Sequence, residues 1–238
     1  RAGHQQAERR LSGDHHGAGQ IYFHPQGDRL WFASNLAALL DRLQDRPAPN
    51  VLQAAQLLSA ARFNAPEETL YEGIYQVPPG HRLEFDGRHW TLFRYWDPRA
   101  VAPLALENDH AVSEAFLACF TEAVACRIAG KRGPAIALSG SLDSGAVAAV
   151  ASELLHAQGR ELQAYTAIPL SRSPVEAHQT GDERPQVEAL RDQLPGLRTH
   201  WLDSADSGLL ASMRSVLDIT RQPVFAAANC YWIMALMR

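Results

Sequence analysis

The sequence predicts two fold classes in succession, an α+β part followed by an α/β part with a parallel sheet. Three observations lead to this prediction. Short strand-like runs joined by tight turns dominate the first part, whereas helical runs alternate with short apolar runs in the second. A proline-containing stretch separates the two. The predicted boundaries are residues 1–97 for the first domain, 98–106 for a linker and 107–238 for the second domain.

The first part contains antiparallel pairs and two short helices. Residues 20–24 and 29–33 have the pattern of two strands, and a glycine-containing turn joins them, which predicts a hairpin. A second hairpin is expected on the turn Asp86-Gly87. Ser34 is the expected N-cap of the first helix. The predicted ranges are helices over 34–43 and 51–61, strands over 81–85 and 89–93, and an irregular segment over 64–77.

The second part predicts a parallel sheet covered by helices, because helices and apolar strands alternate along it. Apolar positions of its long first helix include Val112, Phe116 and Val124. The predicted strands cover 134–138, 161–168 and 198–202, and the predicted helices cover 107–129, 145–157, 182–194, 207–218 and a segment from about 226.

One stretch, residues 135–151, organises the second part. An apolar run leads into the sequence Ser-Gly-Ser-Leu-Asp-Ser-Gly at 139–145 and then into an alanine-rich helical run. A strand, a tight loop and a helix N-terminus in this order direct backbone N–H groups and the positive end of the helix dipole at one point. That arrangement binds anions, and Ser144 or Asp143 is the expected N-cap. A phosphate beside the carboxylate of Asp143 requires a bridging cation, for which Mg²⁺ is the natural choice.

The simplest alternative is a capped turn, since Ser, Asp and Gly are common where a strand passes into a helix. A Walker A loop is excluded, because no Gly-Lys-Ser/Thr follows the glycine. The loop resembles the Ser-Gly-Gly-x-Asp-Ser pyrophosphate loop of ATP pyrophosphatases that adenylate a substrate, with Ser141 in place of the second glycine. This resemblance favours phosphate binding over a plain turn.

Composition narrows the function classes. Hydrophobic residues make up 46% and charged residues 20% of the chain, as in ordinary globular domains, and the net charge of −4 argues against a general nucleic-acid binder. No apolar run is long enough for a membrane span, and the first residues lack an apolar signal region. Cys119 and Cys126 are expected to share a buried helix face, and with Cys230 they indicate reduced thiols and a cytoplasmic location.

Four further segments resemble glutamine-dependent asparagine synthetases. Residues 12–23 are similar to the Ala-Arg-Asp-x-x-Gly-x-x-Pro-Leu-Tyr-Tyr segment of this family, and residues 32–39 to its Phe-Ala-Ser-Glu-x-x-x-Leu segment. Residues 73–81 and 95–97 are similar to the end of its glutaminase domain. The resemblance implies the C-terminal half of an Ntn-hydrolase-like glutaminase over 1–97 and the N-terminal part of an ATP-pyrophosphatase domain over 107–238. The chain is therefore expected to be an internal fragment that is inactive alone.

The resemblance also implies a reaction. ATP activates a carboxylate as an acyl-adenylate with release of pyrophosphate, and ammonia from glutamine then forms the amide. In asparagine synthetases the carboxylate is the side chain of aspartate. ATP, Mg²⁺, glutamine and aspartate or another carboxylate are the implied small molecules, with no nucleic acid or membrane partner; a homodimer is one candidate assembly.

Residue roles follow by position. Leu138 and Ile168 match backbone contacts to adenine, and Asp14 matches the aspartate that binds the glutamine amino group. An alternative role stays open for each of the two: Ile168 can be a core residue of a strand, and Asp14 can cap a turn. Asp182-Glu183 is expected to cap a helix, and His15-His16 to be solvated. The implied ATP and pyrophosphate contacts are Leu138, Ser139, Gly140, Ser141, Asp143, Ser144 and Ile168, with Asp143 also on Mg²⁺.

The sequence departs from the family in ways that keep rival functions open. The family's catalytic cysteine stands at the mature N-terminus, and no internal cysteine here replaces it by position. Gly13 and Asn35 differ from the family's Arg and Glu, which favours relatives that close β-lactam or lasso-peptide rings with an internal amine. A third hypothesis is a non-catalytic ATP-binding regulatory domain, supported by Ser141 alone.

Overall fold

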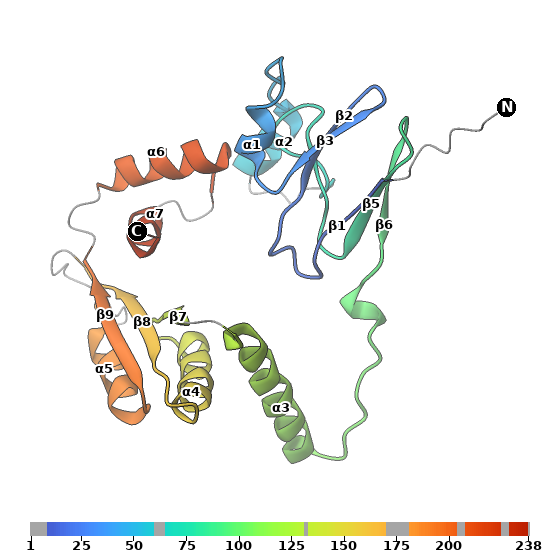
Figure 1. The fold of residues 1–238 in the computed structure, drawn as a ribbon. Helices are drawn as coiled ribbons and strands as arrows, with labels where there is room; N and C mark the ends of the chain where they lie inside the picture. Colours follow the sequence, from blue (N-terminus) through green and yellow to red (C-terminus); the bar gives the residue numbers. More distant parts are fainter. Residues whose placement is uncertain are drawn as a thin grey trace. The chain divides into compact units, whose positions relative to one another are not determined.

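The computed structural model describes residues 9–59, 65–130, 133–169, 181–203, 208–224 and 229–237. The chain forms two compact units. Unit 1 comprises Arg1–Pro103 together with Ser215–Phe225, and unit 2 comprises Leu104–Arg214 together with Ala226–Arg238. Unit 1 therefore takes in a segment from the C-terminal part of the sequence. The elements of both units are drawn in Figure 1.

Unit 1 contains two three-stranded antiparallel sheets, and both predicted hairpins are confirmed. Phe23, Leu83 and Phe85 are almost completely buried in its core. Two pairings were not predicted, because Leu11 is the single apolar residue of β1 and β4 has only two residues. The sheets have the orders β1-β5-β6 and β3-β2-β4, with β1 at Arg9–Ser12, β2 at Tyr22–Gln26, β3 at Arg29–Ala33, β4 at Tyr75–Gln76, β5 at His81–Phe85 and β6 at Trp90–Arg94.

The helices of unit 1 are shorter than predicted. Helix α1 covers Leu36–Leu40 and α2 covers Val51–Leu58, while a 3₁₀ turn covers Pro98–Ala100. The predicted N-cap Ser34 is wrong, because the side chain of Asn35 accepts the hydrogen bond from the Ala38 N–H. The predicted continuation of α2 beyond Ser59 lies outside the described residues.

The predicted parallel sheet of unit 2 is confirmed. Strands β7 (Ala135–Ala137), β8 (Leu162–Ala167) and β9 (Leu197–Leu202) pair in this order. Helix α4 (Leu142–His156) connects β7 to β8 and packs against both, and α5 (Arg184–Gln193) packs against β9 (Figure 1). Their apolar faces and the strands enclose one core that includes Ala148, Ala151, Leu155, Leu162, Ala164 and Val187.

The remaining helices are α3 (Asp109–Ile128), α6 (Leu209–Thr220) and α7 (Cys230–Leu236). Of the predicted apolar positions of α3, Val124 is buried, whereas Val112 and Phe116 are at least half exposed. The prediction that Cys119 and Cys126 share a buried helix face is also wrong, because both residues are exposed. None of the helices described is both long enough and apolar enough to span a bilayer.

Candidate functional site

The candidate site is built where β7 ends. Leu138 continues the strand direction, since its N–H donates to the Tyr165 carbonyl oxygen at 2.9 Å, and its side chain is only 2% exposed. The hydroxyl of Thr166, fully buried in β8, donates to the Leu138 carbonyl oxygen at 2.8 Å. Both hydrogen bonds of the Leu138 peptide unit are thus made to β8, which fixes the point where the loop begins.

Three serine hydroxyls meet in this loop; we call them the hydroxyl cluster. The Oγ of Ser139 lies 2.8 Å from that of Ser141 and 2.9 Å from that of Ser144, and the last two are 3.3 Å apart. The Ser139 N–H donates to the Ser144 Oγ at 3.1 Å, which closes the loop over the helix start. Hydroxyls donate and accept, so this cluster can turn its O–H groups toward an anion.

Helix α4 begins earlier than the sequence predicted. Ser141 is the N-cap residue, although its side chain makes no capping bond, so the predicted caps Ser144 and Asp143 are wrong. Both lie in the first turn instead, because the Gly145 N–H already donates to the Ser141 carbonyl oxygen. The first N–H groups of a helix lack intrahelical partners and carry the positive end of its dipole. The hydroxyl cluster therefore stands at an anion-attracting helix end.

Gly140 lies against α5, a contact that the sequence did not predict. A Cβ at Gly140 would come 3.1 Å from the Cβ of Gln186 and 3.3 Å from its Cγ, closer than ordinary carbon contacts. The Gln186 Oε1 is buried and has no hydrogen-bond partner among the described residues. The absence of a side chain at Gly140 thus allows helix α5 to approach the loop closely. The sequence pattern alone explains this glycine by the approach of an anion.

Asp143 is exposed in the first turn of α4, beside the hydroxyl cluster. The described residues contain no group of three or more His, Cys, Asp or Glu side chains arranged for a metal. A site with a single carboxylate still fits Mg²⁺, because this ion commonly takes one or two carboxylates and completes its shell with phosphate oxygens and water. The donor set suits a Mg²⁺ ion that arrives with a nucleotide.

The other predicted nucleotide contact, Ile168, follows β8, and its N–H donates to the Leu202 carbonyl oxygen at 2.9 Å. Because β7 and β8 are parallel neighbours, Leu138 and Ile168 both lie at the carboxyl edge of the sheet, where such sheets bind ligands. Asp182 forms an ion pair with Arg184 at 2.5 Å, and Glu183, the N-cap of α5, makes no side-chain capping bond.

In unit 1, Asp14 organises its own loop. Its carboxylate accepts hydrogen bonds from the backbone N–H groups of Gly19 at 2.5 Å, Ala18 at 3.1 Å and His16 at 2.8 Å. These bonds, with Gly19 contributing most, lower the pKa of Asp14 to about 2. The carboxylate therefore stays charged at neutral pH, and the geometry is that of a loop-holding residue.

The two histidines that follow Asp14 are exposed, as the sequence predicted, and they also contact aromatic rings. The ring centroid of His15 lies 5.5 Å from that of Tyr95 and 5.1 Å from that of Trp96, and His16 lies 5.4 Å from Trp96. The Tyr95 hydroxyl also donates to the Gly13 carbonyl oxygen at 2.6 Å. Ring contacts to the two histidines and a hydrogen bond to Gly13 thus hold the Asp14 loop against Tyr95 and Trp96.

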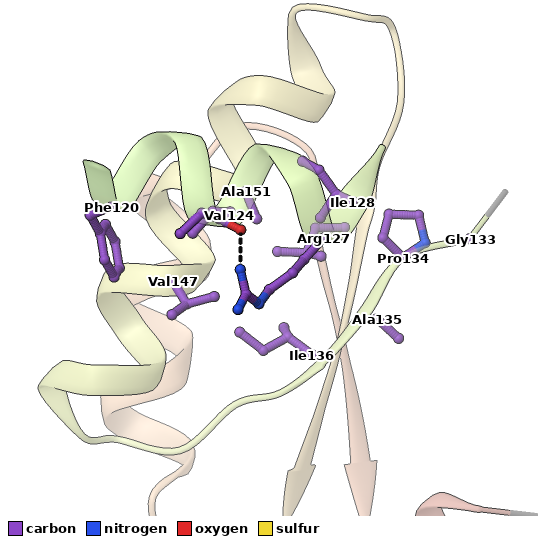
Figure 2. Close-up of a pocket in the computed structure, with 12 residues that line it drawn as sticks. Phe120, Val124, Arg127, Ile128, Gly133, Pro134, Ala135, Ile136, Val147 and Ala151 are labelled. Carbon is purple, nitrogen blue, oxygen red and sulfur yellow. Dashed lines mark hydrogen bonds between the residues drawn. The ribbon is translucent and has the colours of Figure 1, made fainter. Parts of the chain in front are cut away.

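An apolar cavity of about 600 Å³ lies in unit 2 and is shown in Figure 2. Helix α3, strand β7 and helix α4 line it with residues such as Phe120, Ile136 and Val147. The one charged side chain drawn there, Arg127, donates to the Ala123 carbonyl oxygen of its own helix. None of the predicted site residues lines this cavity, so we assign it no part in the chemistry.

Comparison with known families decides the relationship. A family model described as asparagine synthase matches residues 115–238, more than half of the chain and the part that carries the hydroxyl cluster. The chain belongs to the asparagine synthase family. A second model, of a glutamine amidotransferase domain, matches residues 3–96. The order of the two domains agrees with the resemblance seen in the sequence.

A curated relative of this asparagine synthase family member is "Asparagine synthetase [glutamine-hydrolyzing] 3" of Bacillus subtilis (strain 168). The two are 21% identical over 183 residues, which are 75% of this chain and 30% of the relative. The chain thus spans less than a third of the length of that protein.

Proposed function

We propose that the protein is an ATP-dependent carbon–nitrogen ligase that activates a carboxylate as an acyl-adenylate and converts it to an amide with ammonia from glutamine. The observation that carries the proposal is the hydroxyl cluster at the start of α4. Three hydroxyls within 3.3 Å of one another, at a helix N-terminus and at the carboxyl edge of a parallel sheet, suit a polyphosphate.

The chemistry requires such a site. A carboxylate is a poor electrophile, so one of its oxygens attacks the α-phosphorus of ATP, and the bond to pyrophosphate breaks. Negative charge grows on the leaving pyrophosphate, and fixed donors at that point lower the barrier. The hydroxyls of Ser139, Ser141 and Ser144 and the first N–H groups of α4 would supply these donors.

Asp143 would hold Mg²⁺ against the phosphates. The ion neutralises charge on the leaving group when bound. The Leu138 carbonyl oxygen has a second lone pair besides the one that accepts from Thr166, and with the Ile168 carbonyl oxygen it would accept hydrogen bonds from the adenine at the strand ends. The subsequent attack of ammonia on the activated carbonyl carbon expels AMP and leaves the amide. The amidotransferase domain would supply the ammonia. The Asp14 carboxylate has acceptor capacity besides its three backbone hydrogen bonds, and it is the proposed partner of the glutamine amino group.

The test uses the protein purified from the gene that encodes this chain. We expect AMP and pyrophosphate, and not ADP and phosphate, to appear with ATP, Mg²⁺, glutamine and aspartate. Asp143→Asn should lower the rate of AMP release about a hundredfold, as does removal of a comparable charge-stabilising group. Asp109→Asn is the matched control, because this aspartate occupies the first turn of α3 and should leave the rate unchanged.

The acceptor is decided in the same assay. AMP release triggered by an amine-bearing carboxylate or peptide, and not by aspartate, would identify a ring-closing relative, the function that Gly13 and Asn35 favour. The Asn35 side chain caps α1, so its departure from the family's Glu has a structural use that does not depend on chemistry. Binding of ATP and Mg²⁺ without AMP release from any carboxylate would reject catalysis and indicate a regulatory domain.

A further inference from the structure

Unit 1 contains a second cavity, of about 380 Å³, far along the sequence from every residue assigned above to ATP. Helix α2 and the segment 66–70 line it, and Gln222 and Pro223 contribute from the C-terminal segment of the same unit. Its volume lies at the small end of the range of roughly 300–1,000 Å³ for ligand pockets in proteins, so the space suits a small molecule.

Gln53, in the first turn of α2, lines this cavity and is only 2% exposed. Its Nε2 donates to the Glu68 carboxylate at 3.2 Å, but its Oε1 is buried and has no hydrogen-bond partner among the described residues. A buried amide oxygen without a hydrogen-bond partner destabilises the folded state. A ligand that brings an N–H or O–H donor into the cavity removes this destabilisation.

The charge in the cavity selects among donors. Glu68 is the single ionisable side chain among the described lining residues, and none of the ion pairs between described residues includes it. Its Oε2 accepts from Asn50 at 2.9 Å as well as from Gln53, so two amides hold the carboxylate in place. A fixed carboxylate beside a free amide oxygen favours a cation with N–H donors and disfavours an anion.

The rest of the lining is mostly apolar, with Leu57, Leu70 and Pro79 among it. An apolar chain attached to the cation would bury surface there. No Lys, Arg or His stands among the described lining residues to receive a carboxylate, which disfavours a free amino acid. We propose that this cavity binds a small primary alkylamine in its protonated form, with the ammonium group between Gln53 and Glu68.

The site is close in structure to the Asp14 loop. Pro79 lines the cavity, and a Cβ at Gly17 would come 2.7 Å from the Pro79 Cγ, so the proline packs directly on the loop. The Gly80 N–H donates to the Asp14 carbonyl oxygen at 3.0 Å. An occupied cavity should therefore change the environment of the Asp14 loop as well as that of α2.

The test is a titration of the 238-residue chain with n-butylammonium chloride, followed by two-dimensional ¹H–¹⁵N NMR. We expect saturable shifts of the Gln53 side-chain amide and of backbone amides in 67–70 and 15–19. Butyrate, of opposite charge, and n-butanol, without charge, should bind at least about tenfold more weakly. Equal binding of butyrate, or no saturable shift with butylammonium, would overturn the proposal.

Two variants assign the contacts. Glu68→Gln keeps the shape and the acceptor for both amides but removes the charge, and Gln53→Leu removes the free amide oxygen; each should weaken butylammonium binding about tenfold. Gln56→Leu is the matched control, since its Oε1 is also buried without a partner in the described chain, yet it does not line the cavity. If Gln53→Leu fails to fold, Glu68→Gln decides, and unchanged affinity there would overturn the proposal.

Discussion

Replacing Gly140 by alanine tests how the phosphate loop and α5 fit together. The new Cβ would lie 3.1 Å from the Cβ and 3.3 Å from the Cγ of Gln186. Carbon atoms prefer about 3.5–4.0 Å, so one side must move by several tenths of an ångström. The nearest atom is the Gln186 Cβ, whose position is fixed by the backbone and which no rotamer change can move, so the loop or α5 has to shift.

The size of the effect follows from two opposing contributions. Overpacking costs about 1–3 kcal/mol, whereas alanine lowers the entropy of the unfolded chain and returns about 0.4–1 kcal/mol. We therefore expect Gly140→Ala to destabilise unit 2 by about 1–2 kcal/mol. Gly133→Ala, where a Cβ meets nothing within 4 Å, is the control and should be neutral or slightly stabilising.

Hydrogen exchange of the β8 amides measures the free energy of opening of unit 2 itself. Gln186→Gly removes both contacted atoms, so Gly140→Ala should cost less in that background, with a coupling energy of about 1–2 kcal/mol. Strict additivity of the two changes, or a Gly140→Ala variant as stable as Gly133→Ala, would refute the close approach of α5 to the loop.

Three further predictions concern hydrogen bonds of the two units. Thr166→Val should destabilise unit 2 by about 1–2 kcal/mol and speed exchange of the Leu138 amide, because a buried carbonyl oxygen loses its donor; unchanged protection would contradict this. Ser144→Ala should weaken binding of Mg²⁺-pyrophosphate about tenfold in calorimetry, whereas Ser113→Ala, whose hydroxyl bonds the Asp109 carbonyl oxygen within α3, should not. The lowered pKa of Asp14 stabilises the folded chain above pH 3.8, and this contribution is lost as the pH falls through about 2. Asp14→Asn should therefore flatten the loss of stability between these pH values in urea unfolding, and an unaltered pH profile would contradict the role of its backbone hydrogen bonds.

The order of elements could be predicted from the sequence because periodicity and turn residues are local properties. The hairpin at Asp86-Gly87 and the alternation of apolar strands with helices in unit 2 depend on neighbours in the chain. Strand β1 could not be found this way, because Leu11 is its single apolar residue and the strand is held by pairing with β5, about seventy residues away. Helix α3 shows that the apolar character of a residue does not by itself predict burial, since Phe116 is apolar but exposed.

The candidate site was predicted in its residues but not in its packing. The loop sequence indicates the serines and Asp143, because their chemistry and spacing are visible in the chain. Thr166 and Gln186 were missed, since each acts through a contact between elements distant in sequence. The N-cap was also misplaced, because Ser141, Asp143 and Ser144 are all acceptable caps and only the observed hydrogen bond from Gly145 to Ser141 distinguishes them.

The most direct test of the proposed adenylation follows one oxygen atom. Aspartate labelled with ¹⁸O in its side-chain carboxylate is incubated with ATP, Mg²⁺ and glutamine, or with the acceptor found in the AMP-release assay, and the nucleotide product is analysed by mass spectrometry. An acyl-adenylate transfers one carboxylate oxygen to phosphorus, so AMP should carry a single ¹⁸O. Unlabelled AMP, or label in inorganic phosphate alongside ADP, would contradict activation through the loop at Ser139–Ser144.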